Sequence, residues 1–254
     1  VMREEGAMPA IASTECFDKE ELAKRLASSP KIGDINYIKE VSTTEAYTHT
    51  QAAWNEAHFC YKEPCADLKK IVAYDFGAKL NILNELVEAG ASVEVVPHHT
   101  KADVVIDRFK SGEVKGVFLS NGPGDPLVLT EEVAEIKKLI AADIPIFGIC
   151  LGHQLLSIAF GYETYKLKFG HHGGNHPVKN LKTGGVEITA QNHNYNVPNE
   201  ILEVAEPTHI NLFDDTIEGL RYKNKNVFSV QFHPESSPGP HESKYLFKEF
   251  VANI

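Results

Sequence analysis

A lone cysteine, Cys150, stands between an apolar run at 144–149 and a segment of helical character at 154–160. Gly148 and Gly152 flank it at equal distances, which predicts a tight, strained strand–cysteine–helix turn that lifts the thiol clear of a sheet. The N-terminus of the following helix favours the thiolate over the thiol. A buried structural cysteine is the ordinary alternative, but core packing does not need glycines on both sides. The pattern therefore indicates a nucleophile.

A candidate base and an acid to orient it follow another apolar run. Residues 227–232 are typical of a strand and lead directly into His233, Pro234 and Glu235. Nucleophilic catalysis by cysteine needs a base for the thiol proton and a group that holds the base in place. His233 suits the first role and Glu235 the second, while Pro234 ends the strand. A surface histidine beside an acid is common, so this tripeptide carries weight only in combination with the Cys150 turn.

A loop rich in glycine and proline, residues 121–126, follows the apolar run at 116–120. Such a loop at the end of a buried strand exposes backbone N–H groups, which can stabilise the oxyanion of a tetrahedral intermediate. An ordinary strand-to-helix turn has the same composition, so this loop alone does not decide its role.

Together these three motifs resemble those of the class I, triad-type glutamine amidotransferases. The chain is similar in particular to one family of that class, the small, glutamine-hydrolysing chains of carbamoyl-phosphate synthases. The stretches that carry this similarity are residues 72–79, 119–126, 168–178 and 237–241. The similarity extends over roughly residues 38–254, and the His-His-Gly-Gly-Asn-His-Pro stretch at 171–177 is its most specific part.

The resemblance implies a reaction and its residues. Cys150 attacks the side-chain amide of L-glutamine to form a γ-glutamyl thioester, His233 passes the proton to the departing ammonia, and Glu235 orients His233. The oxyanion is expected to be bound by the backbone N–H of Leu151 and that of Gly122 or Gly124.

The other positions that the resemblance assigns to glutamine binding are Gln154, Asn192, Asn194 and Tyr195. The family usually has Gly and Phe where this chain has Asn194 and Tyr195. Asparagine tolerates a positive φ better than most residues, so glutamine binding is expected to survive the change. Without the resemblance, Gln154 is equally well explained as a helix-surface residue and Asn192 as a residue that caps a loop.

The resemblance also implies a partner, a large ATP-binding synthetase subunit that uses the ammonia to make carbamoyl phosphate for arginine and pyrimidine biosynthesis. The chain has no Walker loop and no dinucleotide fingerprint, so no cofactor is expected in it, and ATP and Mg are expected only in the large subunit. Two alternatives remain open: a partner-docking module with weak intrinsic glutaminase activity, or the amidotransferase of another synthetase, such as anthranilate or guanylate synthase.

Composition narrows the function classes. A net charge of −10 argues against non-specific binding to nucleic acid, and no apolar run approaches the length of a membrane span. Four cysteines are too few for a disulfide framework, and a catalytic thiol suits a reducing cytoplasm. The histidines at 171, 172 and 176 could suggest a metal site, but adjacent histidines rarely converge on one ion and no cysteine or carboxylate lies nearby in sequence. We expect no metal. The resemblance implies that this stretch lies near the active site and the partner interface, which favours a docking role.

The apolar and helical runs alternate from residue 70 onward, which predicts an α/β fold with a mostly parallel central sheet and helices on both faces. We expect residues 1–37 to be the remnant of an N-terminal domain in a truncated chain, residues 38–69 to be a linker packed on the main domain, and residues 70–254 to be the glutamine amidotransferase domain. Thr130 is expected to cap a helix through residue 141, and the stretch 162–230 to add short antiparallel strands.

Overall fold

The computed structural model describes residue 4 and residues 6–254, and one sheet of ten strands dominates this part of the chain. In sheet order the strands are β1 (Tyr47–His49), β5 (Ala91–Pro97), β4 (Lys69–Asp75), β6 (Gly116–Leu119), β7 (Ile146–Ile149), β12 (Val227–Val230), β11 (Ile217–Tyr222), β10 (Ala205–Asn211), β8 (Tyr165–Asn180) and β9 (Val186–Asn196). From β5 to β12 all neighbours pair in parallel. The β1 edge and the run from β11 to β9 are antiparallel.

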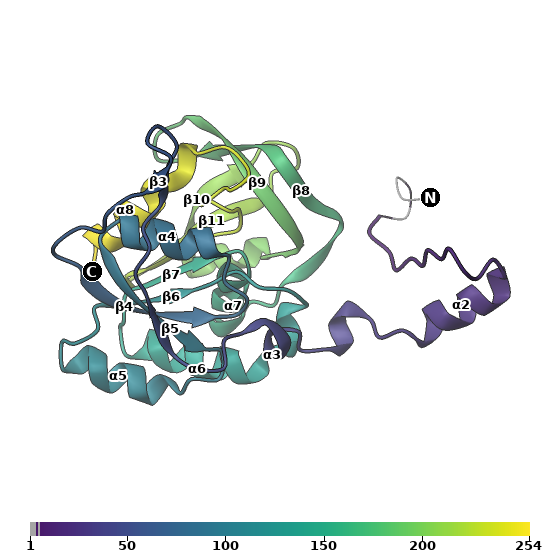
Figure 1. Ribbon diagram of the computed structural model, residues 1–254, viewed down its shortest axis with the longest axis horizontal. Coiled ribbons are helices and arrows are strands. Elements are labelled where there is room, and N and C mark those ends of the chain that lie inside the picture. Colours follow the sequence, from purple (N-terminus) through teal and green to yellow (C-terminus); the bar gives the residue numbers. More distant parts are fainter. Residues whose placement is uncertain (1–3, 5) are drawn as a thin grey trace.

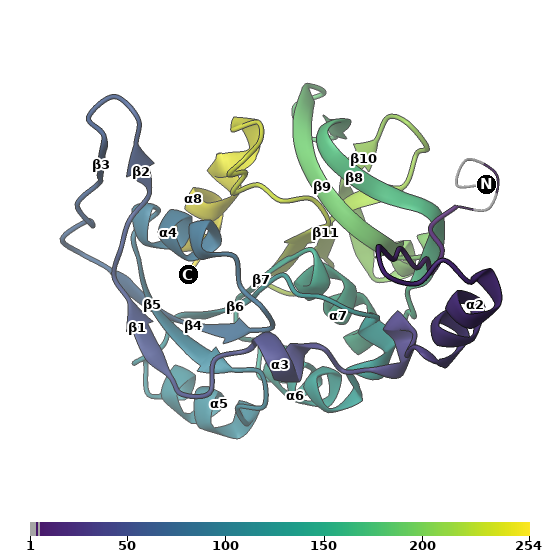
Figure 2. The ribbon, with the colours of Figure 1, turned by 45° about the vertical axis from the view of Figure 1, so that its right-hand side comes forward.

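Helices cover both faces of the parallel strands, as expected (Figure 2). On one face lie α4 (Leu80–Glu88) and α8 (Tyr245–Ala252), and on the other lie α5 (Ala102–Lys110), α6 (Thr130–Ala141) and α7 (Leu151–Ala159). Strand β4 shows why two layers form, because its successive side chains point to opposite faces. Ile71 and Ala73 join the core with α4 and α8, whereas Val72 and Tyr74 join the core with α5, α6 and α7.

Aromatic packing fixes β7, the strand that leads to Cys150. The Phe147 ring stacks on Phe228 of β12 with ring centroids 4.4 Å apart. Phe118 of β6 and Phe247 of α8 meet the same ring edge to face, at 5.5 and 5.9 Å. Phe147 is fully buried, so the strands that carry the cysteine, the histidine and the glycine-rich loop share one rigid core.

The antiparallel part is larger than the sequence predicted. Strands β8 and β9 form one long hairpin that curves away from the parallel strands (Figure 2). Its pairing register shifts between Lys166 and His171 and again between Gly173 and His176. Gly170 and Gly173 have positive φ values of 72° and 124°, so the backbone bends where a regular strand would alternate. These irregularities hide the period of two by which a strand is recognised.

One expected helix cap is wrong. Thr130 is the first residue inside α6, and Leu129 occupies the N-cap position without a side-chain hydrogen bond. The hydroxyl of Thr130 therefore does not close the helix end, which instead continues from the short turn at Pro126–Val128.

The N-terminal segment stands partly apart from the sheet. Helix α2 (Lys19–Ser28) lies well away from the sheet in Figure 1 and buries none of its residues. The chain then returns through α3 (Ile38–Val41), where Ile38 is fully buried, to β1 at the sheet edge. Of the expected remnant of an N-terminal domain, residues 1–3 and 5 lie outside the described residues.

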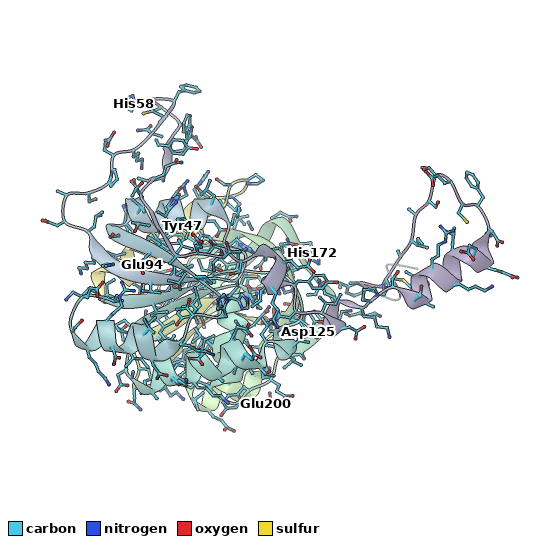
Figure 3. All side chains as sticks on the ribbon, turned by 60° about the horizontal axis from the view of Figure 1, so that its bottom comes forward. Tyr47, His58, Glu94, Asp125, His172 and Glu200 are labelled. Carbon is cyan, nitrogen blue, oxygen red and sulfur yellow. The ribbon has the colours of Figure 1, made fainter. Side chains whose placement is uncertain are left out.

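A small hairpin of β2 (Trp54–Asn55) and β3 (Cys60–Tyr61) projects from the body, with His58 on its connecting turn (Figure 3). Among the described residues, no helix combines the length and apolar character needed to cross a bilayer.

Candidate active site

Cys150 sits at a strained turn between β7 and α7. Its φ of 52° and ψ of −101° are unusual for a residue with a side chain, and such conformations are typical of nucleophiles held at a sharp turn. The residue is buried, and its N–H donates to the carbonyl of Val230 at 2.9 Å, which ties the turn to β12. The side chain stands at the N-cap of α7, where the positive end of the helix favours an anion.

The two flanking glycines are needed for a reason other than the one the sequence suggested. Neither has a positive φ, so the backbone strain falls on Cys150 itself. A Cβ on Gly152 would lie 2.3 Å from the carbonyl oxygen of Leu119, and a Cβ on Gly148 would lie 2.9 Å from the Gly152 backbone. The interpretation that core packing does not need these glycines is wrong: they let α7 pack directly against the backbone of β6 and β7.

His233 and Glu235 form a buried pair beside the cysteine. His233 Nδ1 lies 2.8 Å from Glu235 Oε1, and the Glu235 side chain is completely buried. Burial by itself lowers the pKa of His233, but the charge of Glu235 and then the charge and hydrogen bond of Cys150 outweigh it and raise the pKa to about 10. The imidazole therefore faces the thiol on one side and the carboxylate on the other, and the imidazolium is its favoured form.

Lys79 is a residue of this site that the sequence did not single out for a role. Its Nζ lies 3.3 Å from Glu235 Oε1 and also donates to the carbonyl of Ser236. Asn81, two residues on, donates from Nδ2 to the Glu235 carbonyl at 2.6 Å. Lys79 is the N-cap of α4 and Asn81 lies in its first turn, so the start of the helix that follows β4 holds the segment that carries the carboxylate. A lysine following a buried strand at the catalytic edge of the sheet was the available signal.

The glycine-rich loop meets the start of α7. A Cβ on Gly122 would lie 2.2 Å from the Phe76 carbonyl oxygen and 2.7 Å from Leu151 Cδ2, so only glycine fits there. Leu151 is the first residue of α7, and N–H groups in the first turn of a helix have no partner within the helix. Gly124 has a φ of 99° and faces Tyr37 rather than Leu151. Of the two glycines left open by the sequence, the geometry favours Gly122 beside the nucleophile.

A cavity of about 390 Å³ opens next to His233. Lys79, Asn121, Gln191 and Asn192 supply polar groups to its wall, and small or apolar residues such as Gly173, Gly174, Ala190 and Pro238 supply the rest. Asn192, predicted to bind glutamine, therefore shares a cavity with the proposed base.

The other predicted binding residues, on β9 and α7, do not line this cavity, and Asn194 lines a separate cavity together with Gly124 and residues of the N-terminal segment. Gln154 is buried, and its Nε2 donates to the Tyr195 carbonyl at 2.9 Å and to Gln231 Oε1 at 3.0 Å. Its side chain is therefore not on the helix surface. Burial, and next the hydrogen bond and charge of Asp125 from the glycine-rich loop, raise the pKa of Tyr195 to about 12. Asn194 has no positive φ, so the expected need for a residue that tolerates one does not arise.

His172 links the histidine-rich stretch to this site. Its Nδ1 lies 3.0 Å from Asn192 Oδ1 and its Nε2 lies 3.3 Å from Asn194 Oδ1. The resemblance implied a position near the active site and a docking role for this stretch. It did not give this contact, because the pattern of the stretch predicts a loop whereas it forms part of β8.

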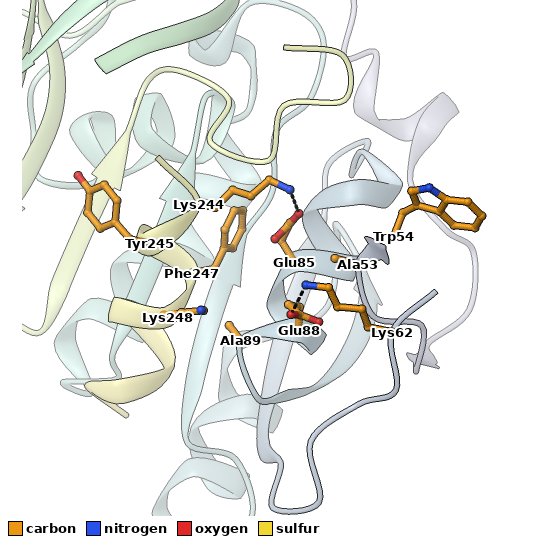
Figure 4. Close-up of a pocket in the computed structure, with 10 residues that line it drawn as sticks. All are labelled: Ala53, Trp54, Lys62, Glu85, Glu88, Ala89, Lys244, Tyr245, Phe247 and Lys248. Atoms are coloured by element: carbon orange, nitrogen blue, oxygen red, sulfur yellow. Dashed lines mark hydrogen bonds and ion pairs between the residues drawn. The ribbon is translucent and has the colours of Figure 1, made fainter. Parts of the chain in front are cut away.

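A second cavity, of about 230 Å³, lies between the small hairpin, α4 and α8 (Figure 4). Two ion pairs stand at its wall, Lys62 with Glu88 at 2.6 Å and Lys244 with Glu85 at 2.5 Å. Neither Cys150 nor His233 lines it, so it is separate from the candidate active site.

One group of side chains has the composition of a metal site. His171, His193 and Glu218 are buried, and their ligand atoms lie within 4.8 Å of one another. His171 Nδ1 and Nε2 already face Glu218 and Asp214 at 3.2 and 2.8 Å, and His193 faces protein oxygens on both sides. We therefore interpret the group as a hydrogen-bond network. The two carboxylates beside His171, Asp214 and Glu218, are distant from it in the sequence, and the pairing of β8 with β10 and of β10 with β11 brings them close.

Comparison with known proteins identifies the family. A model described as "Glutamine amidotransferase class-I" matches residues 72–253, which include every residue of the site described above. The chain belongs to the class I glutamine amidotransferase family. The match confirms the family resemblance drawn from the three sequence motifs.

Relatives place the chain more narrowly within this family. A carbamoyl phosphate synthase small chain from Helicobacter hepaticus is 62% identical over 247 residues, which cover 97% of this chain and 65% of the relative. One from Campylobacter jejuni is 58% identical over 251 residues, covering 99% of this chain and 68% of the relative. The chain thus spans about two thirds of the length of these curated relatives.

Two solved structures share the fold. A Thermoplasma acidophilum protein provisionally assigned as part of a GMP synthase has a TM-score of 0.63 at 22% identity, covering 73% of this chain and 94% of its own. A glutamine amidotransferase from Thermotoga maritima has a TM-score of 0.52 at 18% identity, covering 66% and 76%. They confirm the α/β amidotransferase fold.

Proposed function

We propose that this chain is the glutamine-hydrolysing part of a carbamoyl phosphate synthase. The observation that carries the proposal is the placement of Cys150, at a strained strand-to-helix turn, against a buried His233–Glu235 pair. The high identity to carbamoyl phosphate synthase small chains supports the choice among synthetases. Within this proposal, residues 70–254 form the amidotransferase domain, residues 38–69 are a segment packed on it that adds β1 to the edge of its sheet, and residues 1–37 are a separate N-terminal segment.

The first half-reaction makes a thioester and releases ammonia. The Cys150 thiolate attacks the side-chain amide carbon of L-glutamine, and the N–H groups of Leu151 and Gly122 bind the oxyanion that forms. The His233 imidazolium gives its proton to the amide nitrogen, so that the C–N bond breaks and ammonia leaves. Glu235 holds the ring in orientation and balances its charge, and Lys79 holds Glu235.

The second half-reaction restores the enzyme. Neutral His233 takes a proton from water, which attacks the γ-glutamyl thioester, and the C–S bond breaks to give glutamate and the thiolate. The sum is glutamine and water converted to glutamate and ammonia. Asn192, Asn194, Tyr195 and Gln154 form the proposed glutamine-binding wall beside this chemistry.

Ammonia passes, in this proposal, to a large ATP-binding synthetase subunit, which also holds the ATP and Mg. This chain itself carries no cofactor or metal in the proposed reaction. The product, carbamoyl phosphate, serves arginine and pyrimidine biosynthesis, and the cytoplasm is the proposed compartment because the reaction depends on a free thiol.

The test compares Cys150→Ser with Cys60→Ser, since Cys60 is an exposed free thiol on the projecting hairpin. We expect Cys150→Ser to abolish glutamate release and labelling by a glutamine-like electrophile while the circular dichroism spectrum and melting temperature stay unchanged. Cys60→Ser should keep both activities. Glutamine hydrolysis that persists in Cys150→Ser contradicts the mechanism.

The same assays separate the two alternatives. A docking module binds a large synthetase subunit but gives no stoichiometric labelling of Cys150. An amidotransferase of another synthetase is labelled but fails to support carbamoyl phosphate synthesis when it is mixed with a carbamoyl phosphate synthase large chain.

A further inference from the structure

A buried acid, Glu218, lies behind the glutamine-binding wall and has no part in the reaction described above. It stands on β11 with a completely buried side chain. In the sheet, β10 and β8 separate β11 from β9, yet Glu218 contacts Gln191 of β9 directly. The outer strands therefore curl over, which brings β9 face to face with β11. A backbone hydrogen bond also ties β9 to the segment after β12: the backbone N–H of His233 donates to the Ala190 carbonyl at 2.9 Å.

Three donors surround the Glu218 carboxylate. Asn211 Nδ2 lies 2.9 Å and His171 Nδ1 3.2 Å from Oε1, and Gln191 Nε2 lies 3.0 Å from Oε2. Burial opposes the charge, but the hydrogen bond from His171 and the neighbouring donors lower the pKa of Glu218 below its ordinary value. His171 in turn faces Asp214 at 2.8 Å, so its ring lies between two carboxylates. Glu218 is thus a carboxylate that only accepts hydrogen bonds.

The charge of Glu218 decides how Gln191 is oriented. Because the carboxylate cannot donate, Gln191 must turn its NH₂ group toward Glu218 and its Oε1 toward His193. Gln191 Oε1 lies 3.0 Å from His193 Nε2. A flipped amide would place two oxygens against each other in a buried site, which is strongly unfavourable.

The orientation of Gln191 then decides which nitrogen of His193 carries the proton. His193 Nδ1 lies 2.8 Å from the Tyr195 carbonyl, so both ring nitrogens face oxygen acceptors. Burial lowers the pKa of His193 to about 4, which leaves one ring proton near neutral pH. The Tyr195 carbonyl has a second donor, Gln154 Nε2 at 2.9 Å, whereas Gln191 Oε1 relies on His193. A proton on Nε2 therefore gives both oxygens a donor, but it leaves the lone pair of Nδ1 facing the Tyr195 carbonyl, so the ring depends on the fixed orientation of Gln191 to stay in this tautomer.

We propose that Glu218 is a positioning residue for glutamine binding, which acts through Gln191 and His193 on the Asn192–Tyr195 segment and on Gln154. This inference rests on the proposed function of that segment. It assigns Glu218 no contact with substrate. Its effect should therefore fall on KM for glutamine more than on kcat.

The test is Glu218→Gln, which keeps the size of the side chain and removes its charge. Glu187→Gln is the matched control: Glu187 also accepts from three side chains, Asn180, Ser243 and Tyr245, but on the far part of β9. We expect Glu218→Gln to raise KM for glutamine about tenfold, the scale of one hydrogen bond to a charged group, with kcat changed less than about twofold. Glu187→Gln should leave both constants within about twofold.

A double substitution tests the route through Gln191. In Glu218→Gln combined with Gln191→Glu, the amide and the carboxylate exchange places. The new amide then donates to the new carboxylate, which still accepts from His193 Nε2, so KM should return to within about threefold of the parent value. A KM that is unchanged in the single variant, or still raised in the double one, overturns the inference. A parent protein that does not hydrolyse glutamine overturns the proposed function instead.

Discussion

Removal of the Glu235 charge is the sharpest test of the proposed catalytic pair. Glu235→Gln keeps the shape of the side chain, and its amide oxygen can still accept from His233 Nδ1. The new NH₂ group falls where Oε2 stands, a buried atom without a hydrogen-bond partner among the described residues. The fold should therefore tolerate the change, while the electrostatic support of the imidazolium is lost.

The size of the effect follows from the pKa of His233. Its rise from 6.5 to about 10 corresponds to about 5 kcal/mol in favour of the imidazolium, for a side chain that is 11% exposed. Glu235 and Cys150 share this stabilisation, so loss of one charge should lower the pKa by about one to two pH units. The protonated form is present below the pKa and is lost as the pH rises through it. The alkaline limb of kcat/KM should therefore move from near pH 10 to about pH 8–9.

At pH 7 the ring stays protonated, and the expected loss comes from weaker orientation. A hydrogen bond to a charged group contributes about 1.5–3 kcal/mol, so kcat should fall by about ten- to a hundredfold. Initial rates of glutamate release between pH 6 and pH 10.5 measure both effects.

The structure offers a matched control in a second buried pair, where His98 Nδ1 lies 2.8 Å from Glu132 Oε1, outside the cavity beside His233. Glu132→Gln should leave the pH profile unchanged. An alkaline limb that stays in place in Glu235→Gln would refute the assignment, and so would an equal loss of activity in both variants.

Two further predictions concern the framework around the nucleophile. Gly152→Ala should lower the free energy of unfolding by about 2–3 kcal/mol, because the new Cβ meets the Leu119 carbonyl oxygen. The control Gly185→Ala adds only an ordinary contact to Thr183 and should change the free energy of unfolding little. Equal denaturation midpoints for the two variants would contradict this prediction. Phe147→Ala should lower the free energy of unfolding by about 3–5 kcal/mol, because it opens a cavity among the stacked rings. Denaturant unfolding should show a lower midpoint with an unchanged slope. A loss below about 1 kcal/mol would contradict this prediction and show that the neighbouring rings move into the space.

The parallel half of the fold was predictable because buried parallel strands are continuous apolar runs that end in glycine-rich loops. The runs before Gly122, Cys150 and His233 are of this kind, and their carboxyl ends must meet at one edge of the sheet. That rule, applied to three short motifs, predicted that Cys150, His233 and the loop with Gly122 lie at one edge of the sheet, without any knowledge of the turns between them.

Pattern predicted antiparallel strands at 162–230, but not the length of the β8–β9 hairpin. Strand β8 carries polar, exposed residues and bends at Gly170 and Gly173, so it shows neither alternation nor an apolar run. Contacts made through it were therefore invisible. His172 lies between Asn192 and Asn194 only because β8 and β9 pair, and Glu218 reaches Gln191 only because the sheet curls. Lys79 was missed for a related reason, since its partner Glu235 is distant in the sequence.

The turn at Cys150 shows how the position of a strained turn can be predicted from an incomplete physical reason. The sequence indicated that glycines permit a strained backbone, yet the strained residue is Cys150, with a φ of 52°. Gly152 instead allows its N–H to donate to the Ser120 carbonyl at 3.1 Å while its α-carbon passes beside Leu119. The start of α7 is thereby held against the end of β6, which carries the oxyanion loop. Close packing of helix on strand thus fixes the distance between Cys150 and the loop proposed to stabilise its intermediate, and this is why a side chain at Gly152 should harm both the fold and the proposed chemistry.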